Sequence, residues 1–204
     1  QITVLAGVNG AGKSSVIGAA LRAGGADFFN PDEAARNMRL AKPGIRLATA
    51  NLQAWEEGLT GLRAAIDRGS SFTIETTLAG STMLNEFIRG ATSGMRLAVY
   101  YVGLNTVDLH IARVAARRRE GGHDIPEADI RRRFEASPRN LTLLVPYVTD
   151  LTIFDNSAES HGGEPRPEVI LHVEGGDLMI APDLENLPGW AVGPAQAVQE
   201  RFAD

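Results

Sequence analysis

The stretch that decides the fold is Gly7-Val8-Asn9-Gly10-Ala11-Gly12-Lys13-Ser14. It fits the pattern G-x-x-x-x-G-K-[ST], whose glycines let backbone N–H groups curl around phosphate oxygens. In this pattern Lys13 reaches the β and γ phosphates, and the Ser14 hydroxyl binds Mg²⁺ at the start of the following helix. The sequence therefore predicts a P-loop that binds ATP with Mg²⁺. The loop residues expected at ATP are Gly7, Asn9, Gly10, Ala11, Gly12, Lys13, Ser14 and Ser15.

The segments around the loop alternate between strand and helix patterns. Predicted strands cover 2–6, 27–29, 71–75, 96–102 and 151–154, with a hairpin at 168–173 and 178–180 around Gly175-Gly176-Asp177. Predicted helices cover 14–21, a segment from Asn30 onward, 46–68, 81–91, 106–119, 126–144 and 194–202. Such alternation gives right-handed crossovers and a parallel sheet covered on both faces. The predicted fold class is α/β: a three-layer P-loop NTPase sandwich with a mainly parallel sheet of about five strands, a helical Arg-rich lid and a small C-terminal hairpin.

Composition narrows the class of protein further. With 204 residues, 44% hydrophobic and 22% charged, the chain has ordinary globular usage and suits a single domain. We expect a P-loop kinase domain at 1–157, with its lid at about 113–141, and a C-terminal extension at 158–204 packed on it. The absence of cysteine excludes disulfides, thiolate metal sites and cysteine nucleophiles. With no membrane-length apolar run, no signal-peptide pattern and a net charge of −5, we expect a cytoplasmic protein with neither membrane nor nucleic-acid partners.

Two carboxylates are predicted at the sheet edge that carries the phosphate loop. Asp32 follows the strand predicted at 27–29, and Glu75 ends the next predicted strand. Open α/β sheets bind ligands at this edge, and a hydroxyl that accepts a phosphoryl group needs a carboxylate to take its proton. Asp32 is therefore the candidate base, or alternatively only an acid at a helix start. Glu75 is a candidate for holding the acceptor or acting through water on Mg²⁺, or a structural partner of an arginine; Thr77 offers the acceptor a hydroxyl.

An arginine cluster is the third feature with chemical meaning. Eight arginines fall between residues 113 and 139, in a chain that is acidic overall. A solvated helix face would explain them, but beside a phosphate loop they predict a lid that holds phosphate oxygens bidentately. From two successive helices, we expect Arg117 and Arg132 to act on the transferring phosphoryl group and Arg113 and Arg133 to bind ATP.

The connector between these two helices, Gly121-Gly122-His123-Asp124, is predicted to act as a hinge. His123 is expected to form hydrogen bonds there rather than to catalyse. The stretch 161–167 is rich in glycine and proline and is predicted to be a loop.

Several short runs together resemble the zeta toxin family of P-loop kinases. They are the phosphate loop, Phe29-Asn30-Pro31-Asp32-Glu33, and Phe72-Thr73-Ile74-Glu75-Thr76-Thr77-Leu78. The match is closest to the short branch of that family, often labelled predicted ABC-type ATPases, whose lid resembles the segment 113–141. With Asp155-Asn156-Ser157, the resemblance covers about residues 1–157.

The resemblance implies a kinase that transfers the γ-phosphate of ATP to an alcohol group. In better-known relatives the acceptor is the 3′-hydroxyl of UDP-N-acetylglucosamine, and an antitoxin protein holds the enzyme in check. Carried over, Lys13 and Ser14 bind phosphates and Mg²⁺, Asp32 is the base, Glu75 and Thr77 lie at the acceptor, and the lid arginines serve the phosphates. This chain departs from those relatives in its shorter acceptor-side insertions and its Gly-Gly-His lid.

The sequence lacks the signatures of two other classes of P-loop protein. The chain has no Asn-Lys-x-Asp-like guanine signature and no Leu-Ser-Gly-Gly-Gln-type signature, which disfavours a GTPase and an ABC-type ATPase. A kinase acting on a small-molecule hydroxyl is the main hypothesis. A regulatory ATPase or nucleotide-dependent switch acting on a macromolecule is the alternative, and an inactive nucleotide-binding module is a third.

Overall fold

A computed structural model describes residues 1–119, 125–158 and 167–203 of the chain. Its strands are β1 (Ile2–Ala6), β2 (Phe72–Thr76), β3 (Leu97–Gly103), β4 (Asp150–Asp155), β5 (Glu168–Glu174) and β6 (Asp177–Ile180). Its α-helices are α1 (Ala19–Ala23), α2 (Pro31–Ala41), α3 (Leu47–Arg68), α4 (Ser81–Thr92), α5 (Val107–Arg119), α6 (Glu127–Leu144) and α7 (Val192–Arg201). Short turns of other helix types are η1 (Ser14–Gly18), η2 (Val145–Tyr147) and η3 (Gly189–Ala191). No helix in the described ranges is long and apolar enough to cross a membrane.

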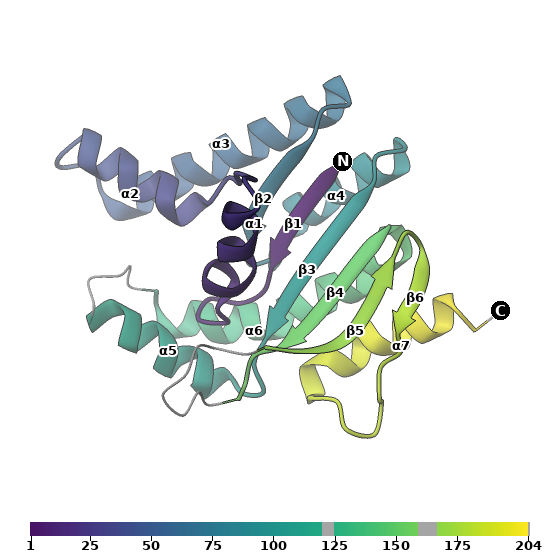
Figure 1. The fold of residues 1–204 in the computed structure, drawn as a ribbon. Coiled ribbons are helices and arrows are strands. Elements are labelled where there is room, and N and C mark those ends of the chain that lie inside the picture. Colours follow the sequence, from purple (N-terminus) through teal and green to yellow (C-terminus); the bar gives the residue numbers. More distant parts are fainter. Residues whose placement is uncertain (120–124, 159–166, 204) are drawn as a thin grey trace.

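The six strands form one sheet in the order β2-β1-β3-β4-β5-β6 (Figure 1). The first four strands in this order run parallel, and β5 and β6 are antiparallel to their neighbours. The parallel part confirms the α/β prediction. The C-terminal hairpin predicted from Gly175-Gly176-Asp177 extends this same sheet through β4. The carboxyl ends of β1, β2, β3 and β4 meet at one edge, where the phosphate loop leaves β1 (Figure 1).

The strand predicted at 27–29 is reduced to a single bridge between Phe29 and Ile74. Phe29 donates its N–H to the carbonyl of Thr73 and accepts from the N–H of Glu75, both at 2.9 Å. The pairing cannot continue because the next residue, Asn30, is the N-cap of α2: its side chain accepts from the backbone N–H groups of the first helical turn. A strand prediction at 27–29 was therefore wrong in length, although the chain does run beside β2.

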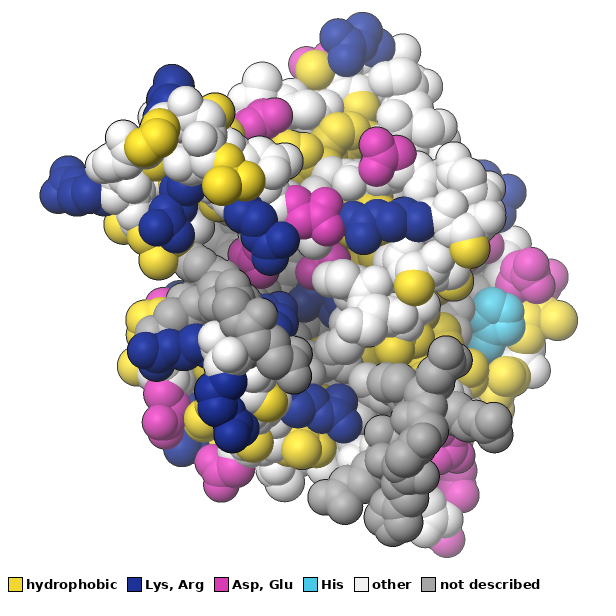
Figure 2. Space-filling view, turned by 60° about the vertical axis from the view of Figure 1, so that its left-hand side comes forward, with side chains coloured by type: hydrophobic (Ala, Val, Ile, Leu, Met, Phe, Trp, Pro, Cys, Tyr) yellow, Lys and Arg dark blue, Asp and Glu magenta, His cyan; other side chains and the backbone are white. Residues whose placement is uncertain are grey.

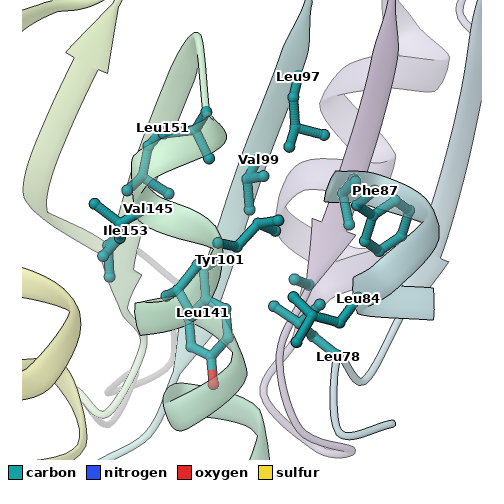
Figure 3. Close-up of a cluster of buried hydrophobic side chains, with 14 of the residues drawn as sticks. Leu78, Leu84, Phe87, Leu97, Val99, Tyr101, Leu141, Val145, Leu151 and Ile153 are labelled. Carbon is teal, nitrogen blue, oxygen red and sulfur yellow. The ribbon is translucent and has the colours of Figure 1, made fainter. Parts of the chain in front are cut away.

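Alternating side chains of the strands separate into two cores, one on each face of the sheet. On one face Val4, Val99 and Tyr101 pack against α3, α4, α6 and α7. Figure 3 shows part of this core, where Val99 and Tyr101 of β3 lie between Phe87 of α4 and Leu141 of α6. On the other face Leu5 and Val102 pack against η1, α1 and α5. This arrangement is the predicted three-layer sandwich.

Helix α3 divides its apolar residues between two environments. In its second half Leu59, Leu62 and Ile66 are buried in the core. In the first half, however, Ala50 and Ala54 pack against α2, whereas Leu52 and Trp55 are 55% and 37% exposed. The helix predicted over 46–68 is therefore present, but only its second half faces the main core; the first half packs on α2.

Candidate active site

Close packing of the phosphate loop explains its glycines. Gly7 has φ 135°, and a Cβ atom there would lie 2.1 Å from the carbonyl oxygen of Val102. Gly12 has φ 95°, and a Cβ atom there would lie 2.6 Å from Nδ2 of Asn156. Both positions combine a left-handed backbone with a neighbour too close for any side chain, so only glycine is accommodated.

Three polar side chains hold this loop in place. The sequence predicts Arg133 at the site, but it does not point to Asn156 or His110. Asn156, after β4, donates from Nδ2 to the carbonyl of Ala11 at 2.8 Å. His110, on α5, lies with Nδ1 2.8 Å from the carbonyl oxygen of Asn9, and because a carbonyl only accepts, Nδ1 carries the proton. Arg133, on α6, donates to Oδ1 of Asn9 at 2.6 Å. The loop is thus fixed by side chains from three distant segments, which no local pattern reveals.

A cluster of charged and polar side chains lies at the end of the loop. The buried carboxylate of Glu75 accepts hydrogen bonds from Oγ of Ser14 at 2.7 Å and from Nδ2 of Asn30 at 3.1 Å. Nζ of Lys13 lies 3.7 Å from Glu75 and 3.4 Å from the carbonyl of Val8. Asn30 therefore has two roles, since its oxygen caps α2 and its nitrogen holds Glu75.

The ammonium of Lys13 is buried and has no short contact among the described residues. Burial lowers the pKa of Lys13, and the carboxylates of Glu75 and Asp32 oppose this shift. A buried ammonium with acceptors only at 3.4 and 3.7 Å retains donors for another anion. A buried positive charge with hydrogen-bond donors left over is what a phosphate-binding site requires.

Two adjoining cavities open beside this cluster. The smaller has a volume of about 310 Å³ and is lined by Asn9, Gly10, Gly12, Lys13, Ser14, Ser15, Val16, Asp32, Glu75, Arg113, Arg117, Asn156 and Ala158. The larger has a volume of about 540 Å³ and is lined by Asn9, Lys13, Asn30, Pro31, Asp32, Leu47, Ala48, Asn51, Leu52, Trp55, Glu75, Thr76, Thr77, Ile125, Pro126, Asp129 and Arg133.

Four residues line both cavities and so mark their boundary: Asn9, Lys13, Asp32 and Glu75. Figure 2 looks onto this face, where basic side chains gather around a hollow between the α2–α3 pair and the α5–α6 pair. Asp32 is exposed, and its carboxylate has no hydrogen-bond or ion-pair partner in the described part of the chain. Thr77 reaches only the larger cavity. The structure thus brings all the predicted carboxylates and the lysine to one place.

The predicted arginines divide between the two cavities and the outer surface. Arg113 and Arg117 of α5 line the smaller cavity, beside the phosphate loop. Arg133 of α6 lines the larger cavity, where burial lowers the pKa of its guanidinium. Arg131 pairs on the surface with Glu127 at 2.7 Å.

Arg132 is not brought to the site, contrary to the prediction. Its guanidinium is exposed and pairs with Asp129 at 3.0 Å, and it lines neither cavity. Successive helical residues point about 100° apart, so three arginines in a row cannot all face inward. Arg133 shares a face with Ile130 and Ser137, at spacings of three and four, and those neighbours are buried. Among the three successive arginines, only Arg133 lies at helical spacing from both buried residues, so this spacing would have pointed to it.

The two helices predicted to form a lid, α5 and α6, pack directly on the phosphate loop. Val114 of α5 and Ile130 of α6 form a small apolar cluster with Val8 of the loop and with Ile125. The predicted hinge at 121–124, including His123, and most of the predicted loop at 161–167 lie outside the described residues.

The residues at the end of the loop suit a magnesium ion held together with nucleotide phosphates. Among the residues that the structure describes, no group of three His, Asp or Glu side chains could hold a metal ion alone. Mg²⁺ in phosphoryl-transfer sites is bound through one or two protein oxygens plus phosphates and waters. Ser14 and Glu75, whose oxygens lie 2.7 Å apart, supply a hydroxyl and a carboxylate of the required kind.

The buried imidazole of His110 gives the site a pH-dependent stability. Burial lowers the pKa of His110 to about 4, and the nearby charges of Lys13 and Arg113 act in the same direction. Above pH ~6.5 the imidazole is neutral in both the folded and unfolded chain; as pH falls below this value, only the unfolded chain takes up the proton. The free energy of unfolding is therefore expected to fall by up to ~1.4 kcal/mol per pH unit between pH ~6.5 and ~4, about 3 kcal/mol in all.

Urea unfolding of wild type and of His110→Gln across this pH range tests the prediction. The variant is expected to lose this part of the pH slope, because an amide does not titrate there. His172→Gln is the matched control, since His172 is only partly buried on β5 and is not in the site. If the unfolding free energies of wild type and His110→Gln changed equally with pH, the pKa of His110 would not be lowered by folding.

Comparisons with known proteins agree with this architecture. Residues 2–136, which are 135 of the 204 residues, match the family described as AAA domain. An uncharacterised protein of Haemophilus influenzae is 27% identical over 132 residues, which cover 63% of this chain and 88% of that protein.

Solved structures with a similar fold include two assemblies. One is AvrRxo1-ORF1:-ORF2 with ATP, at a TM-score of 0.63 and 19% identity over 88% of this chain; the alignment spans 60% of the length of that protein. Another is from the PezAT chromosomal toxin–antitoxin system of Streptococcus pneumoniae, at a TM-score of 0.54 and 13% identity, covering 76% of this chain and 66% of that one. The chain belongs to the AAA domain family of P-loop proteins, and its fold is similar to that of zeta-toxin-like P-loop kinases.

Proposed function

We propose that the chain is an ATP-dependent kinase that transfers the γ-phosphate to a hydroxyl group of a small molecule. One observation carries this proposal: two cavities of different character meet at Lys13, Asp32 and Glu75. An ATPase without an acceptor needs one such cavity. A kinase needs two that share a boundary, so that the phosphoryl group can pass from one bound molecule to the other.

ATP is assigned to the smaller cavity. Residues of the phosphate loop line it, and Arg113 and Arg117 border it from α5. The loop N–H groups and the Lys13 ammonium would hold the phosphates, and the arginines would neutralise charge that develops on the transferring group. We accordingly place the γ-phosphate at the boundary, beside Lys13.

The acceptor is assigned to the larger cavity, with its hydroxyl at Asp32. The acceptor oxygen attacks the γ-phosphorus, the bond from that phosphorus to the β–γ bridging oxygen breaks, and ADP leaves with the electron pair. The hydroxyl proton passes to the Asp32 carboxylate, which has no competing partner in the described part of the chain. Thr77 lies in the same cavity and would hold the acceptor by a hydrogen bond.

Mg²⁺ would be held by Oγ of Ser14, by ATP phosphate oxygens, and by waters oriented by Glu75. When bound, the ion supplies positive charge that neutralises the phosphates during transfer. Glu75 is itself fixed by Ser14 and Asn30, so its carboxylate is oriented before the ligands arrive.

Glu75→Gln is expected to lower kcat by about 10- to 100-fold and to raise the Mg²⁺ concentration needed for half-maximal rate, because an amide orients metal-bound water less well than a carboxylate. Steady-state rates over a magnesium series measure both effects. Glu174→Gln, at the far end of β5, is the control and is expected to match wild type. An unchanged magnesium dependence in Glu75→Gln would remove Glu75 from the metal site.

The proposed acceptor is taken from the resemblance to the zeta toxin family, and the proposed partner from proteins with a similar fold. A nucleotide sugar such as UDP-N-acetylglucosamine is the first acceptor to test. The PezAT structure belongs to a toxin–antitoxin system, and AvrRxo1-ORF1 was solved with ORF2. We propose that this chain likewise has a protein partner of antitoxin type and acts in the cytoplasm, where ATP is supplied.

Release of ADP separates a kinase from a regulatory ATPase. The purified chain is incubated with ATP and Mg²⁺, alone or with a panel of small hydroxyl compounds, a protein extract or nucleic acid. A kinase predicts ADP release that depends on one class of small molecule. Stimulation only by protein or nucleic acid would contradict the proposal and favour a regulatory ATPase.

A further inference from the structure

One wall of the larger cavity is a mainly apolar helix face. Ala48, Asn51, Leu52 and Trp55 of α3 recur at intervals of three, one and three residues, so they share one side of the helix. All four line the cavity. The wall is therefore a continuous strip of α3 that ends in an indole ring.

The fold itself does not account for this strip. Leu52 and Trp55 are 55% and 37% exposed, whereas the core side of the same half-helix is made of Ala50 and Ala54. Large apolar side chains that project into a cavity, rather than into the core, lose the benefit of burial unless something covers them. A ligand in the cavity would cover them.

The opposite side of the cavity is suited to the same ligand. Ile125 and Pro126, just before α6, contribute apolar surface, and Arg133 and Thr77 contribute polar groups. A volume of about 540 Å³ is within the range of pockets that enclose small organic molecules, which are mostly apolar with a few placed polar groups. A ring system between the apolar parts and a hydroxyl at Asp32 would fill it.

We propose that the phosphoryl acceptor carries a flat, aromatic ring that stacks on Trp55, and that Trp55 determines this specificity. This inference rests on the proposed function only in calling the ring-bearing ligand the acceptor. Binding of the ring at Trp55 can be measured without turnover. The acceptor class is then a nucleoside or nucleoside derivative, or another aromatic alcohol, and not a simple polyol or sugar acid. The ring lies on Trp55, and the hydroxyl points to the boundary at Asp32.

Tryptophan fluorescence tests ring binding without any turnover. The chain has two tryptophans, Trp55 in the cavity and Trp190, which is buried against Tyr101 and Gly103. With the ATP site saturated by a non-hydrolysable ATP analogue and Mg²⁺, uridine and UDP-N-acetylglucosamine are expected to quench the emission. N-acetylglucosamine and gluconate are expected to leave it unchanged. Trp55→Leu is expected to abolish the quenching; quenching that persists in this variant, or none in wild type, would overturn the proposal.

Steady-state kinetics separate a stacking surface from a general structural role. Trp55→Leu is expected to raise KM for a ring-bearing acceptor by roughly 5- to 150-fold with kcat little changed, since stacking is worth ~1–3 kcal/mol. Trp55→Phe is expected to recover most of the loss, and Leu143→Ala, an exposed leucine outside both cavities, is the control.

The two proposals fail in different ways. Phosphorylation of gluconate or other ring-free polyols, equally by wild type and Trp55→Leu, would overturn the ring site and leave the kinase. Quenching by uridine without phosphorylation of any ring-bearing acceptor would retain the ring site and overturn the kinase.

Discussion

Asp32→Asn is expected to lower the rate of phosphoryl transfer by about 10²- to 10⁴-fold while ATP binding stays near that of wild type. The carboxylate lies at the boundary of the two cavities and has no competing partner among the described residues. Asparagine keeps the size of the side chain and its place in the first turn of α2 but cannot accept the hydroxyl proton. Acceptor-dependent ADP release and titration with an ATP analogue measure the two quantities separately.

Glu33→Gln is the matched control for this variant. Glu33 is the next residue on α2, pairs with Arg22 at 2.7 Å on the surface and lines neither cavity. It is expected to retain wild-type transfer. A loss of less than about tenfold in Asp32→Asn, or an equal loss in both variants, would show that Asp32 acts only in the helix start.

Lys13→Met is expected to reduce transfer by at least about 10²- to 10³-fold and to weaken ATP binding as well. The variant removes the buried ammonium that lies at the boundary of the cavities, so the phosphates lose charge neutralisation in both the bound and the transition state. Lys42→Met is the control, because Lys42 is the only other lysine and is exposed at the end of α2.

Stability must be followed in the same variant, since Lys13 is also the ion-pair partner of buried Glu75. Leaving that carboxylate unpaired is costly. The double variant Lys13→Met/Glu75→Gln removes both charges and is expected to regain stability but not activity. Recovery of transfer in the double variant would mean that the lysine acts through folding rather than on phosphate.

The sequence was informative where function is carried by contiguous residues. The phosphate loop and the Asn30-Pro31-Asp32 helix start are local patterns whose chemistry requires those residue types, and the structure has a loop and an α2 start at those positions. The sheet followed from the alternation of apolar segments, because each strand of a covered parallel sheet must be apolar on both faces.

The remaining features depend on contacts between distant segments. Asn156, just after β4, and His110, on α5, support the loop, and their positions follow only from the sheet order. The choice of Arg133 over Arg132 depends on the phase of α6 against its buried face. The split of α3 at Trp55 depends on where the sheet ends, which hydrophobic spacing within the helix does not encode.

Transfer of label from γ-labelled ATP to a small molecule tests the central claim most directly. The purified chain is incubated with Mg²⁺ and a panel of acceptors led by UDP-N-acetylglucosamine, beside Asp32→Asn and Glu33→Gln, and the products are separated. We expect label on one class of small hydroxyl compound, with wild-type and Glu33→Gln protein but not with Asp32→Asn. Label appearing only as inorganic phosphate, at a rate that Asp32→Asn leaves unchanged, would contradict it.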